Sequence, residues 1–267
     1  WAGTDVGIYQ SSDGGATWIN QLKGPTLRLT GVSFTSASTG TAVGQFVNGI
    51  GAETGKIIRT TDGGITWNVQ YSSFNKYLNG VFMYDANRGT VVGYDGFGSN
   101  GALILHTTDG GATWNPQTVG TFLDLLSVSF TDANNGTVVG GGVILRTTNG
   151  GAAWTSQPDI YGLNDVCFID STTGFAVGYA SRGTIIRTTD AGTTWTLLPS
   201  GSVEEIFTGV FFTDKNTGVV VGSKNWLAEI VRTTDGGTTW NQVYSNGSYS
   251  HHLSRVSFAD ANTGIAV

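Results

Sequence analysis

The sequence has little of what marks several large classes of protein. Only 12% of its 267 residues are charged, four are prolines, and Cys167 is the single cysteine. One cysteine excludes an intramolecular disulfide framework and a zinc site built from several cysteines. No run of about 18 apolar residues is present, so we expect no direct membrane insertion. The net charge of -6 disfavours a nucleic-acid partner, because such partners are bound mainly by clustered Lys and Arg.

Metal ions and cofactors are not expected either. A calcium ion needs several oxygen ligands, whereas each recurring Asp-Gly-Gly turn supplies one carboxylate. His251 and His252 would point to opposite faces of an extended segment, so they make no ready metal pair. Cys167 lies between Val166 and Phe168, where a packed strand side chain is a simpler interpretation than a nucleophile.

Glycine and small polar residues are abundant instead. Few Lys and Glu, many Gly, Ser, Thr and Asn, and the single cysteine favour an extracellular or cell-surface location, with the periplasm as the alternative. The sequence begins at Trp1 without an initiator Met, which suggests a processed or excised segment. The protein could therefore be part of a larger surface protein or assembly.

Six eight-residue segments match one template that ends in Trp, and we call each of them a box turn. Consecutive box-turn tryptophans are 49, 47, 40, 41 and 45 residues apart. This spacing equals four short strands with their turns, which is typical of a propeller blade. The box turns are Ser11–Trp18, Thr60–Trp67, Thr107–Trp114, Thr147–Trp154, Thr188–Trp195 and Thr233–Trp240.

Each repeat contains four predicted strands. In one copy the first strand is Val128–Phe130, the second is Thr137–Val139, the third is Val143–Arg146, and the fourth begins at Trp154. Alternating apolar residues with Asn-Gly and Asp-Gly turns between them are hairpin signals. The sequence thus predicts an all-β propeller of four-stranded antiparallel blades.

The two ends of the chain complement each other. Residues 254–267 supply a first and a second strand, and residues 1–20 supply a third and a fourth. Joined as a composite blade, they would close a six-bladed ring and remove free sheet edges. A seven-bladed or incomplete ring is the alternative. Residues 1–267 are expected to form a single domain.

The repeat resembles known propeller families. The pattern Ser/Thr-x-Asp-x-Gly-x-Thr-Trp resembles the Asp box, or bacterial neuraminidase (BNR) repeat, of sialidases. The longer pattern, Ile/Leu-x-Arg-Thr-Thr-Asp-Gly-Gly-x-Thr-Trp followed by Val-x-Phe-x-Asp-x-Asn-x-Gly, is more similar to the photosystem II stability/assembly factor-like propellers. The resemblance covers essentially the whole chain. It implies the fold and no single activity, because fold and function are loosely linked.

The shared residues of the box turns are interpreted as structural. The carboxylate can accept hydrogen bonds within its turn, the Thr hydroxyl can fasten the turn, and the Trp can be buried between blades. Asn149 replaces Asp in one copy, which favours a hydrogen-bond acceptor over a catalytic acid. The structural set is Asp13, Trp18, Asp62, Trp67, Asp109, Trp114, Asn149, Trp154, Asp190, Trp195, Asp235 and Trp240.

An arginine precedes the box turn in four copies. The structural interpretation is that each guanidinium spans neighbouring strands or blades. The alternative is an anion-binding ring, and the assembly-factor resemblance implies an arginine-rich surface that binds a partner protein. The position holds Arg59, Arg146, Arg187 and Arg232, and it holds Gln10 and His106 in the other two copies.

Function is expected in the irregular loops on the face opposite the box turns. Aromatic residues interleaved with a few charges there suit a protein hot spot or carbohydrate stacking. The candidate ligand-binding residues are Phe46, Tyr77, Tyr94, Phe97, Asp124, Tyr161, Arg182, Glu205, Trp226 and His252.

Catalysis is the less favoured interpretation, and no catalytic residue is assigned. The Arg-Ile-Pro segment of sialidases is missing. A glycosidase could use two of Asp95, Asp124, Asp165, Glu204 and Glu205, but a linear sequence gives no separation between them. We therefore favour a non-catalytic binding or scaffold propeller for a protein or glycan. The alternatives are a sialidase-like or endoglucanase-like glycoside hydrolase and an architectural unit of a larger surface protein.

Overall fold

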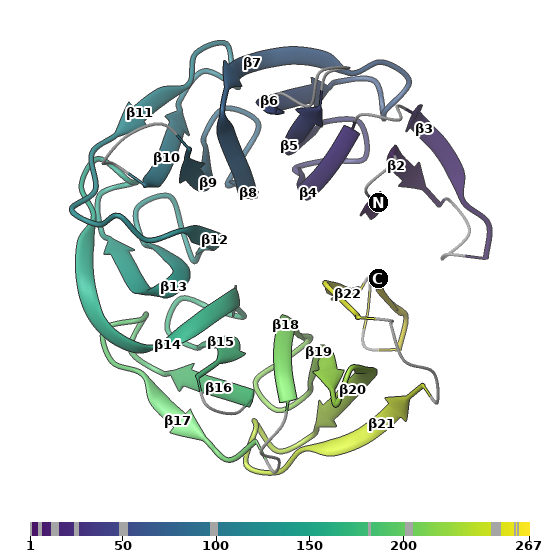
Figure 1. Cartoon of the computed structure of the whole chain (residues 1–267), viewed down its shortest axis with the longest axis vertical. Coiled ribbons are helices and arrows are strands. Elements are labelled where there is room, and N and C mark those ends of the chain that lie inside the picture. The colour runs from purple at the N-terminus through teal and green to yellow at the C-terminus, as the bar shows by residue number, and fades with distance from the viewer. Residues whose placement is uncertain are drawn as a thin grey trace.

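The structure is a ring of antiparallel β-sheets (Figure 1). It is a computed structural model, and it describes residues 2–4, 7–11, 16–23, 27–47, 53–96, 101–180, 183–200, 205–246, 252–258, 260 and 262–267. Within these ranges every regular element is a β-strand. The described residues contain no helix long and apolar enough to cross a membrane.

Three of the sheets have four strands each, paired in chain order. In each, the first strand is nearest the centre of the ring and the last is at the rim (Figure 1). They consist of β4 (Leu27–Phe34), β5 (Gly40–Val47), β6 (Glu53–Thr60) and β7 (Asn68–Phe74); β8 (Lys76–Met83), β9 (Gly89–Asp95), β10 (Ala102–Thr107) and β11 (Asn115–Gln117); and β18 (Glu205–Phe212), β19 (Gly218–Lys224), β20 (Leu227–Thr233) and β21 (Asn241–Ser245).

A longer sheet combines two blades. The start of β14 pairs with β13 at Thr155, and its end pairs with β15 at Phe168, so β14 is the rim strand of one blade and the inner strand of the next. β13 likewise pairs with β12 in its first half and with β14 in its second. The elements are β12 (Leu125–Phe130), β13 (Gly136–Thr147), β14 (Thr155–Phe168), β15 (Gly174–Tyr179), β16 (Gly183–Thr188) and β17 (Thr196–Leu198).

The terminal strands form two separate sheets in the described part of the chain. β1 (Ala2–Thr4), β2 (Gly7–Gln10) and β3 (Ile19–Lys23) pair with one another, as do β22 (Val256–Phe258) and β23 (Gly264–Ala266). This differs from the expected composite blade, because β1 occupies the place beside β2 that β23 would take there. Closure by residues 1–20 with 254–267, the six-blade count and the single domain stay predictions.

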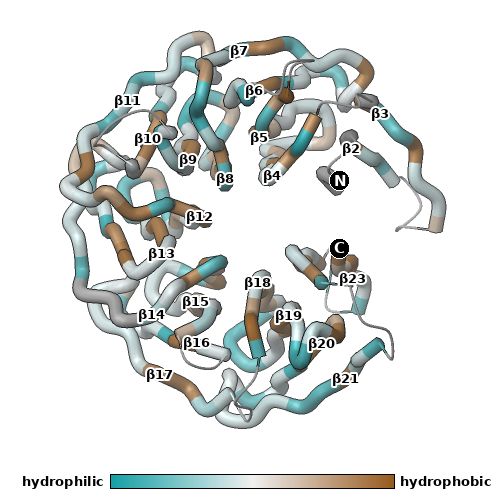
Figure 2. The backbone as a smooth tube through the Cα atoms, in the orientation of Figure 1, coloured by the Kyte–Doolittle hydropathy of each residue, from teal (hydrophilic) through white to brown (hydrophobic). Residues whose placement is uncertain are grey.

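The hydrophobic core is divided among clusters between neighbouring blades. Val43 and Ile57 of one blade pack with Leu78 and Val91 of the next, and all four are fully buried. Hydrophobic segments recur in every blade around the ring (Figure 2). Because each cluster draws side chains from two blades, each blade stabilises its neighbours.

In four blades an aromatic contact links the end of the first strand to the box-turn tryptophan. The Trp67 ring lies edge-on to Phe34, with centroids 6.1 Å apart, and the same contact joins Trp154 to Phe130. A Cβ added to Gly136, at the start of the second strand, would lie 2.6 Å from the Phe130 ring. Glycine is therefore required at this position for space. The predicted all-β propeller of four-stranded antiparallel blades is confirmed.

Candidate functional site

The box turns are closed by hydrogen bonds within the turn. Asp62 Oδ1 accepts from the Thr60 hydroxyl at 2.7 Å and from the Thr66 N–H at 2.9 Å, and Oδ2 accepts from the Thr66 hydroxyl at 2.5 Å. These donors lower the pKa of Asp62 to about 2. The same bonds recur at Asp109, Asp190 and Asp235. Asp13 lies outside the described residues, and Trp18 is half-buried.

The box turn that contains Asn149 differs from the others at two positions that interact with each other in those copies: Asn149 replaces Asp, and Ala153 replaces Thr. Asn149 Oδ1 accepts from the Thr147 hydroxyl and from the Ala153 N–H, as a carboxylate oxygen does in the other copies. An asparagine amide offers only one acceptor oxygen. The hydroxyl that would need the second oxygen is missing, because Ala153 replaces the usual Thr. The Asp and Asn side-chain oxygens and the Thr hydroxyls of the box turns thus serve the turn itself.

One face of the ring is built from these turns, and we call it the turn face. In each of five blades, a backbone N–H of the box turn donates to the turn between the first and second strands; Gly63 donates to Ser38 and Gly110 to Asn87, for example. The opposite face carries the loops between second and third strands and the connections between blades. We call it the loop face.

Exposed large apolar side chains gather on the loop face. Among the described residues, the exposed large apolar side chains of the turn face include Ile65 and Tyr84. Several more exposed apolar side chains lie on the strands at the rim of the ring. The loop face exposes more of them, and they come from four different blades: Phe74, Phe122, Leu123, Tyr179, Ile206 and Trp226. Exposed apolar residues gathered on one face are typical of an interaction surface.

Trp226 is the most prominent of these side chains. It is 69% exposed and lies at the tip of the β19–β20 hairpin, where Lys224 and Leu227 are the last paired residues. Asn225 and Trp226 have φ values of 51° and 66°, the left-handed conformations of a two-residue hairpin turn. The His252 ring lies edge-on to the indole at 6.0 Å. The structure therefore brings two of the predicted ligand-binding residues together.

The other predicted aromatic residues are less available. Tyr77 and Tyr94 face each other across β8 and β9 with ring centroids 6.1 Å apart. Lys56 Nζ lies over the Phe46 ring at 4.1 Å. Tyr161 packs against a buried cluster. These half-buried side chains support their own blades, and predicted residues Phe97 and Arg182 lie outside the described residues.

The predicted carboxylates separate into different environments. Asp124 is exposed, whereas Glu205 is 2% exposed and its Oε1 lies 3.2 Å from Lys224 Nζ. The sequence interpretation missed Glu229, which is 3% exposed; burial and then the charge of Glu205 raise its pKa. Glu229 is the acidic residue at a third-strand position that holds Lys56, Leu103, Val143 or Thr184 in other copies, and this difference was the signal in the sequence.

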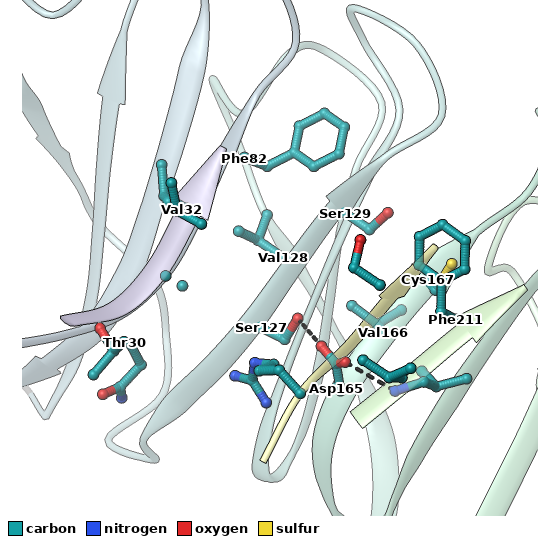
Figure 3. Close-up of a pocket in the computed structure, with 18 of the residues that line it drawn as sticks. Thr30, Val32, Phe82, Ser127, Val128, Ser129, Asp165, Val166, Cys167 and Phe211 are labelled. Atoms are coloured by element: carbon teal, nitrogen blue, oxygen red, sulfur yellow. Dashed lines mark hydrogen bonds between the residues drawn. The ribbon is translucent and has the colours of Figure 1, made fainter. Parts of the chain in front are cut away.

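The centre of the ring holds a cavity of about 560 Å³ lined by the inner strands. Its polar residues include Asp165, which accepts hydrogen bonds from the Ser127 hydroxyl at 2.7 Å and from the Val210 N–H at 3.1 Å (Figure 3). Asp165 thus connects three strands, β12, β14 and β18. Cys167 also lines the cavity, and burial raises the pKa of its thiol to about 11, which disfavours the reactive thiolate at neutral pH.

Of the predicted ligand-binding residues that the structure describes, none lines the central cavity. Five inner strands contain a β-bulge, and the residue after the bulge lies beside the inner strand of the next blade. This position is Gly31, Gly80 and Gly209 in three copies but Ser127 and Asp165 in two others. The replacement of glycine by Ser127 and Asp165 was visible in the sequence. Its meaning was missed because the sequence interpretation did not predict the β-bulges.

Comparison with solved structures places the chain among β-propellers. YCF48 from Cyanidioschyzon merolae superposes with a TM-score of 0.68 at 19% identity, over 98% of this chain and 86% of that protein. A structure of YCF48 bound to D1 peptide superposes with a TM-score of 0.56 at 18% identity, over 90% and 88% of the two chains. An ancestral GH74 enzyme superposes with a TM-score of 0.66 at 16% identity, over 92% of this chain and 37% of the enzyme.

At these identities the similarity establishes the fold alone. No family model matches the chain, and no curated protein matches it by sequence. The neighbours agree with the expected similarity to photosystem II assembly factor propellers. They include a propeller that binds a peptide and a propeller that is an enzyme, so the function has to be argued from the residues of this chain.

Proposed function

We propose that this chain is a non-catalytic propeller that binds a partner protein through its loop face, with Trp226 as the main anchor. The observation that carries the proposal is the conformation of Trp226. A two-residue hairpin turn of this type favours glycine at its second position, because φ is positive there. Trp226 instead has a φ of 66° and leaves 69% of its surface in water.

The energetics of Trp226 favour a binding role over a structural one. A bulky residue in the left-handed conformation costs about 1–2 kcal/mol, and an exposed indole recovers little of this by burial. Such local strain often occurs at binding sites. Tryptophan is also enriched among the residues that dominate binding energy in protein interfaces.

The surroundings of Trp226 fit a protein partner. Exposed apolar side chains on several other blades, including Phe122 and Tyr179, would form the rest of a broad contact surface. A protein interface extends over many residues, whereas a small ligand is held in one concave pocket. The structure of YCF48 bound to D1 peptide is a precedent for a propeller with a polypeptide ligand.

A glycan partner and a glycosidase are the alternatives. Trp226 with His252 could also stack on a sugar ring, and one structural neighbour is a GH74 enzyme. The carboxylates considered for catalysis make structural contacts instead: Asp165 bridges inner strands, and Asp95 is paired with Lys76. Asp124 is exposed, and Glu204 lies outside the described residues.

The test is site-specific photocrosslinking from the two faces. A photoreactive phenylalanine analogue replaces Trp226 in one variant and Ile65 in a second, because Ile65 on the turn face is 79% exposed and so a matched control. We expect discrete protein adducts from position 226 alone, in extracts of the source cells. Equal adducts from both positions, or adducts from position 65 alone, would contradict the proposal.

The captured partner then permits a quantitative test. Trp226→Ala should weaken its binding by about 30-fold, the scale of an interface hot spot, and Ile65→Ala should leave it unchanged. Binding of a polysaccharide that Trp226→Ala abolishes, without any protein adduct, would establish the glycan alternative. Turnover of that polysaccharide, abolished by Asp124→Asn, would establish the glycosidase.

We further propose an extracellular or cell-surface location and a role within a larger assembly. The supporting observation is the composition, which has few charged residues and one cysteine. Fractionation of the source cells with an antibody against the chain tests the location. Recovery in the cytoplasm alone would contradict it, and an apparent mass equal to the free chain would contradict the assembly.

A further inference from the structure

A recurring arginine joins neighbouring blades on the turn face. Arg59 Nη2 donates to the Ala86 carbonyl of the next blade at 2.7 Å, and Arg187 Nη1 reaches the Gly236 carbonyl at 3.5 Å. Arg146 Nε makes a similar bond to the Ala191 carbonyl at 2.9 Å. These contacts cross a blade boundary and end on a backbone carbonyl. The arginines therefore fill equivalent places between blades.

At two of the boundaries between blades, the arginine guanidinium lies against the same kinds of backbone group. A Cβ added to Gly110 would lie 3.1 Å from the Ala86 oxygen and 3.5 Å from Arg59 Nη2. A Cβ added to Gly236 would lie 3.1 Å from the Lys215 oxygen and 3.4 Å from Arg187 Nη1. The site is thus formed by a box-turn glycine and by a carbonyl from the turn between the first and second strands.

The boundary between the β8–β11 blade and the next blade has the same glycine and carbonyl groups, but it has no arginine at the equivalent position. A Cβ on Gly150 would lie 3.0 Å from the Ala133 oxygen and 4.0 Å from Asn134 Oδ1, with no guanidinium nearby. The residue at the arginine position is His106, whose Nδ1 lies 3.3 Å from the hydroxyl of Thr90 in its own blade. The shorter side chain leaves a cavity of about 220 Å³ that its neighbours line.

The polar groups of this cavity favour a planar cation. Among the hydrogen bonds of the described residues, none ends on the carbonyl of Ala133 or Gly150, the counterparts of Ala86 and Gly236. Asn134 adds a side-chain oxygen at the wall. A guanidinium donates several hydrogen bonds in a plane and accepts none, which matches a wall of carbonyl oxygens.

The remaining lining does not oppose a cation. The Phe82 and Phe130 rings line the cavity with centroids 5.8 Å apart, and guanidinium groups stack well on aromatic rings. Arg88 also lines it, but its charge is offset by Asp85 at 2.6 Å and its guanidinium lies over the Tyr84 ring. Burial lowers the pKa of His106, which favours the neutral form of its ring.

We propose that this cavity binds a guanidinium group from outside the chain, in the place that an arginine of the chain fills at the other boundaries. The source is either an arginine side chain of a partner protein or a small guanidino compound. The site lies on the turn face, so it is separate from the loop-face surface and independent of the proposed function.

The test uses amide chemical shifts of the isotopically labelled chain. We titrate it with N-acetylarginine methylamide and, as a matched cation without the planar group, with N-acetyllysine methylamide. Saturable shifts at Ala133 and Gly150 with the arginine probe alone are expected. The lack of saturable shifts, or equal shifts with the lysine probe, would overturn the proposal.

Two substitutions test the mechanism in opposite directions. His106→Arg should fill the cavity with the chain's own guanidinium and abolish the shifts. Arg59→His should reproduce the cavity one boundary earlier and create new saturable shifts at Ala86 and Gly110. A folded His106→Arg variant that binds as well as the parent would overturn the proposal, as would an Arg59→His variant without new shifts.

A further arm identifies the source of the group. If the peptide Ala-Arg-Ala binds at least fivefold more tightly than methylguanidine, contacts beyond the guanidinium contribute, and a partner's arginine is the source. Equal affinities indicate a small guanidino compound.

Discussion

Glu229 lies beside Glu205 and Lys224 in the interior of the β18–β21 blade, where one positive charge faces two carboxylates. Burial raises the folded-state pKa of Glu229, and repulsion from Glu205 adds to the effect. A carboxyl whose folded pKa exceeds its unfolded value becomes destabilising as the pH rises above that unfolded value, about 4.3 for Glu.

We therefore expect Glu229→Gln to raise the urea midpoint at pH 7 and to leave it nearly unchanged at pH 4. The amide keeps the shape of the protonated carboxyl and removes the charge that forms at neutral pH. Urea denaturation of both proteins at the two pH values measures the effect. A lower midpoint of the variant at pH 7 would show that Lys224 compensates both carboxylates.

Asn149 and Ala153 allow a second residue-scale prediction. Asp109→Asn should destabilise the chain, because the Thr113 hydroxyl loses its acceptor oxygen. Adding Thr113→Ala recreates the pair found at Asn149 and Ala153, so the double variant should lose less stability than the sum of the single variants. Thermal melting of the four proteins forms the cycle. Additive losses would mean that the two positions are not coupled.

The β19–β20 hairpin connects stability and binding within one element. Trp226→Gly places the favoured residue at the second turn position, and we expect stability to rise by about 1 kcal/mol while partner binding is lost. Asn225→Gly is the matched control, because asparagine already tolerates positive φ. Urea denaturation and the affinity for the captured partner measure the two effects. A large stability loss in Trp226→Gly would instead assign Trp226 to the fold.

Side-chain hydrogen bonds also join the inner strands of neighbouring blades. At the bulge, the side chain of Asn79 donates to the Leu125 carbonyl of the next blade at 2.9 Å, and Asn164 donates to the Phe207 carbonyl at 2.6 Å. In β12 the same place holds Leu126, which has no such donor.

Asn79→Leu should therefore cost about 1 kcal/mol, because the Leu125 carbonyl loses its side-chain donor. Leu126→Asn is the reciprocal variant, and it should be neutral or stabilising because it supplies the missing donor. Chemical denaturation compares the two. Equal losses from both substitutions would show that the position responds to packing and not to the hydrogen bond.

For the whole molecule, the repeated box turns predict a common sensitivity to acid. The pKa values of Asp62, Asp109 and Asp235 are about 2 in the fold, below about 3.9 for an unpaired Asp. A depressed carboxyl pKa contributes stability that is present above the unfolded value and is lost as the pH falls through the folded value.

In the Glu229→Gln variant, which lacks the opposing pH dependence of Glu229, we expect the melting temperature to be nearly constant between about pH 7 and pH 5 and to fall between about pH 4 and pH 2. Circular dichroism melts across this range measure it. Because the turns lie in several blades that share their cores, the loss should occur in one transition. A melting temperature that is unchanged at pH 2 would contradict the role of these carboxylates.

Much of the fold could be predicted because its determinants are local. The box turns use Asp, Gly and Thr at fixed spacing, and their hydrogen bonds join residues two to four positions apart, as from Thr60 to Asp62 and from Thr66 to Asp62. Strand order followed from short hairpins. The candidate site was less predictable, because the exposure of Trp226 and the burial of Glu205 depend on blades and loops packed around them.

By itself the sequence determined that this protein is a propeller of repeated four-stranded antiparallel blades, since turn chemistry and alternation act within one repeat. Only the tertiary structure decided which residues meet across repeats. Ser127 and Asp165 are 38 positions apart yet share a hydrogen bond in the central channel, and the cavity beside His106 exists only because two blades pack side by side. Such contacts depend on strand bulges and on the angle between blades, and neither is encoded in the spacing of one repeat.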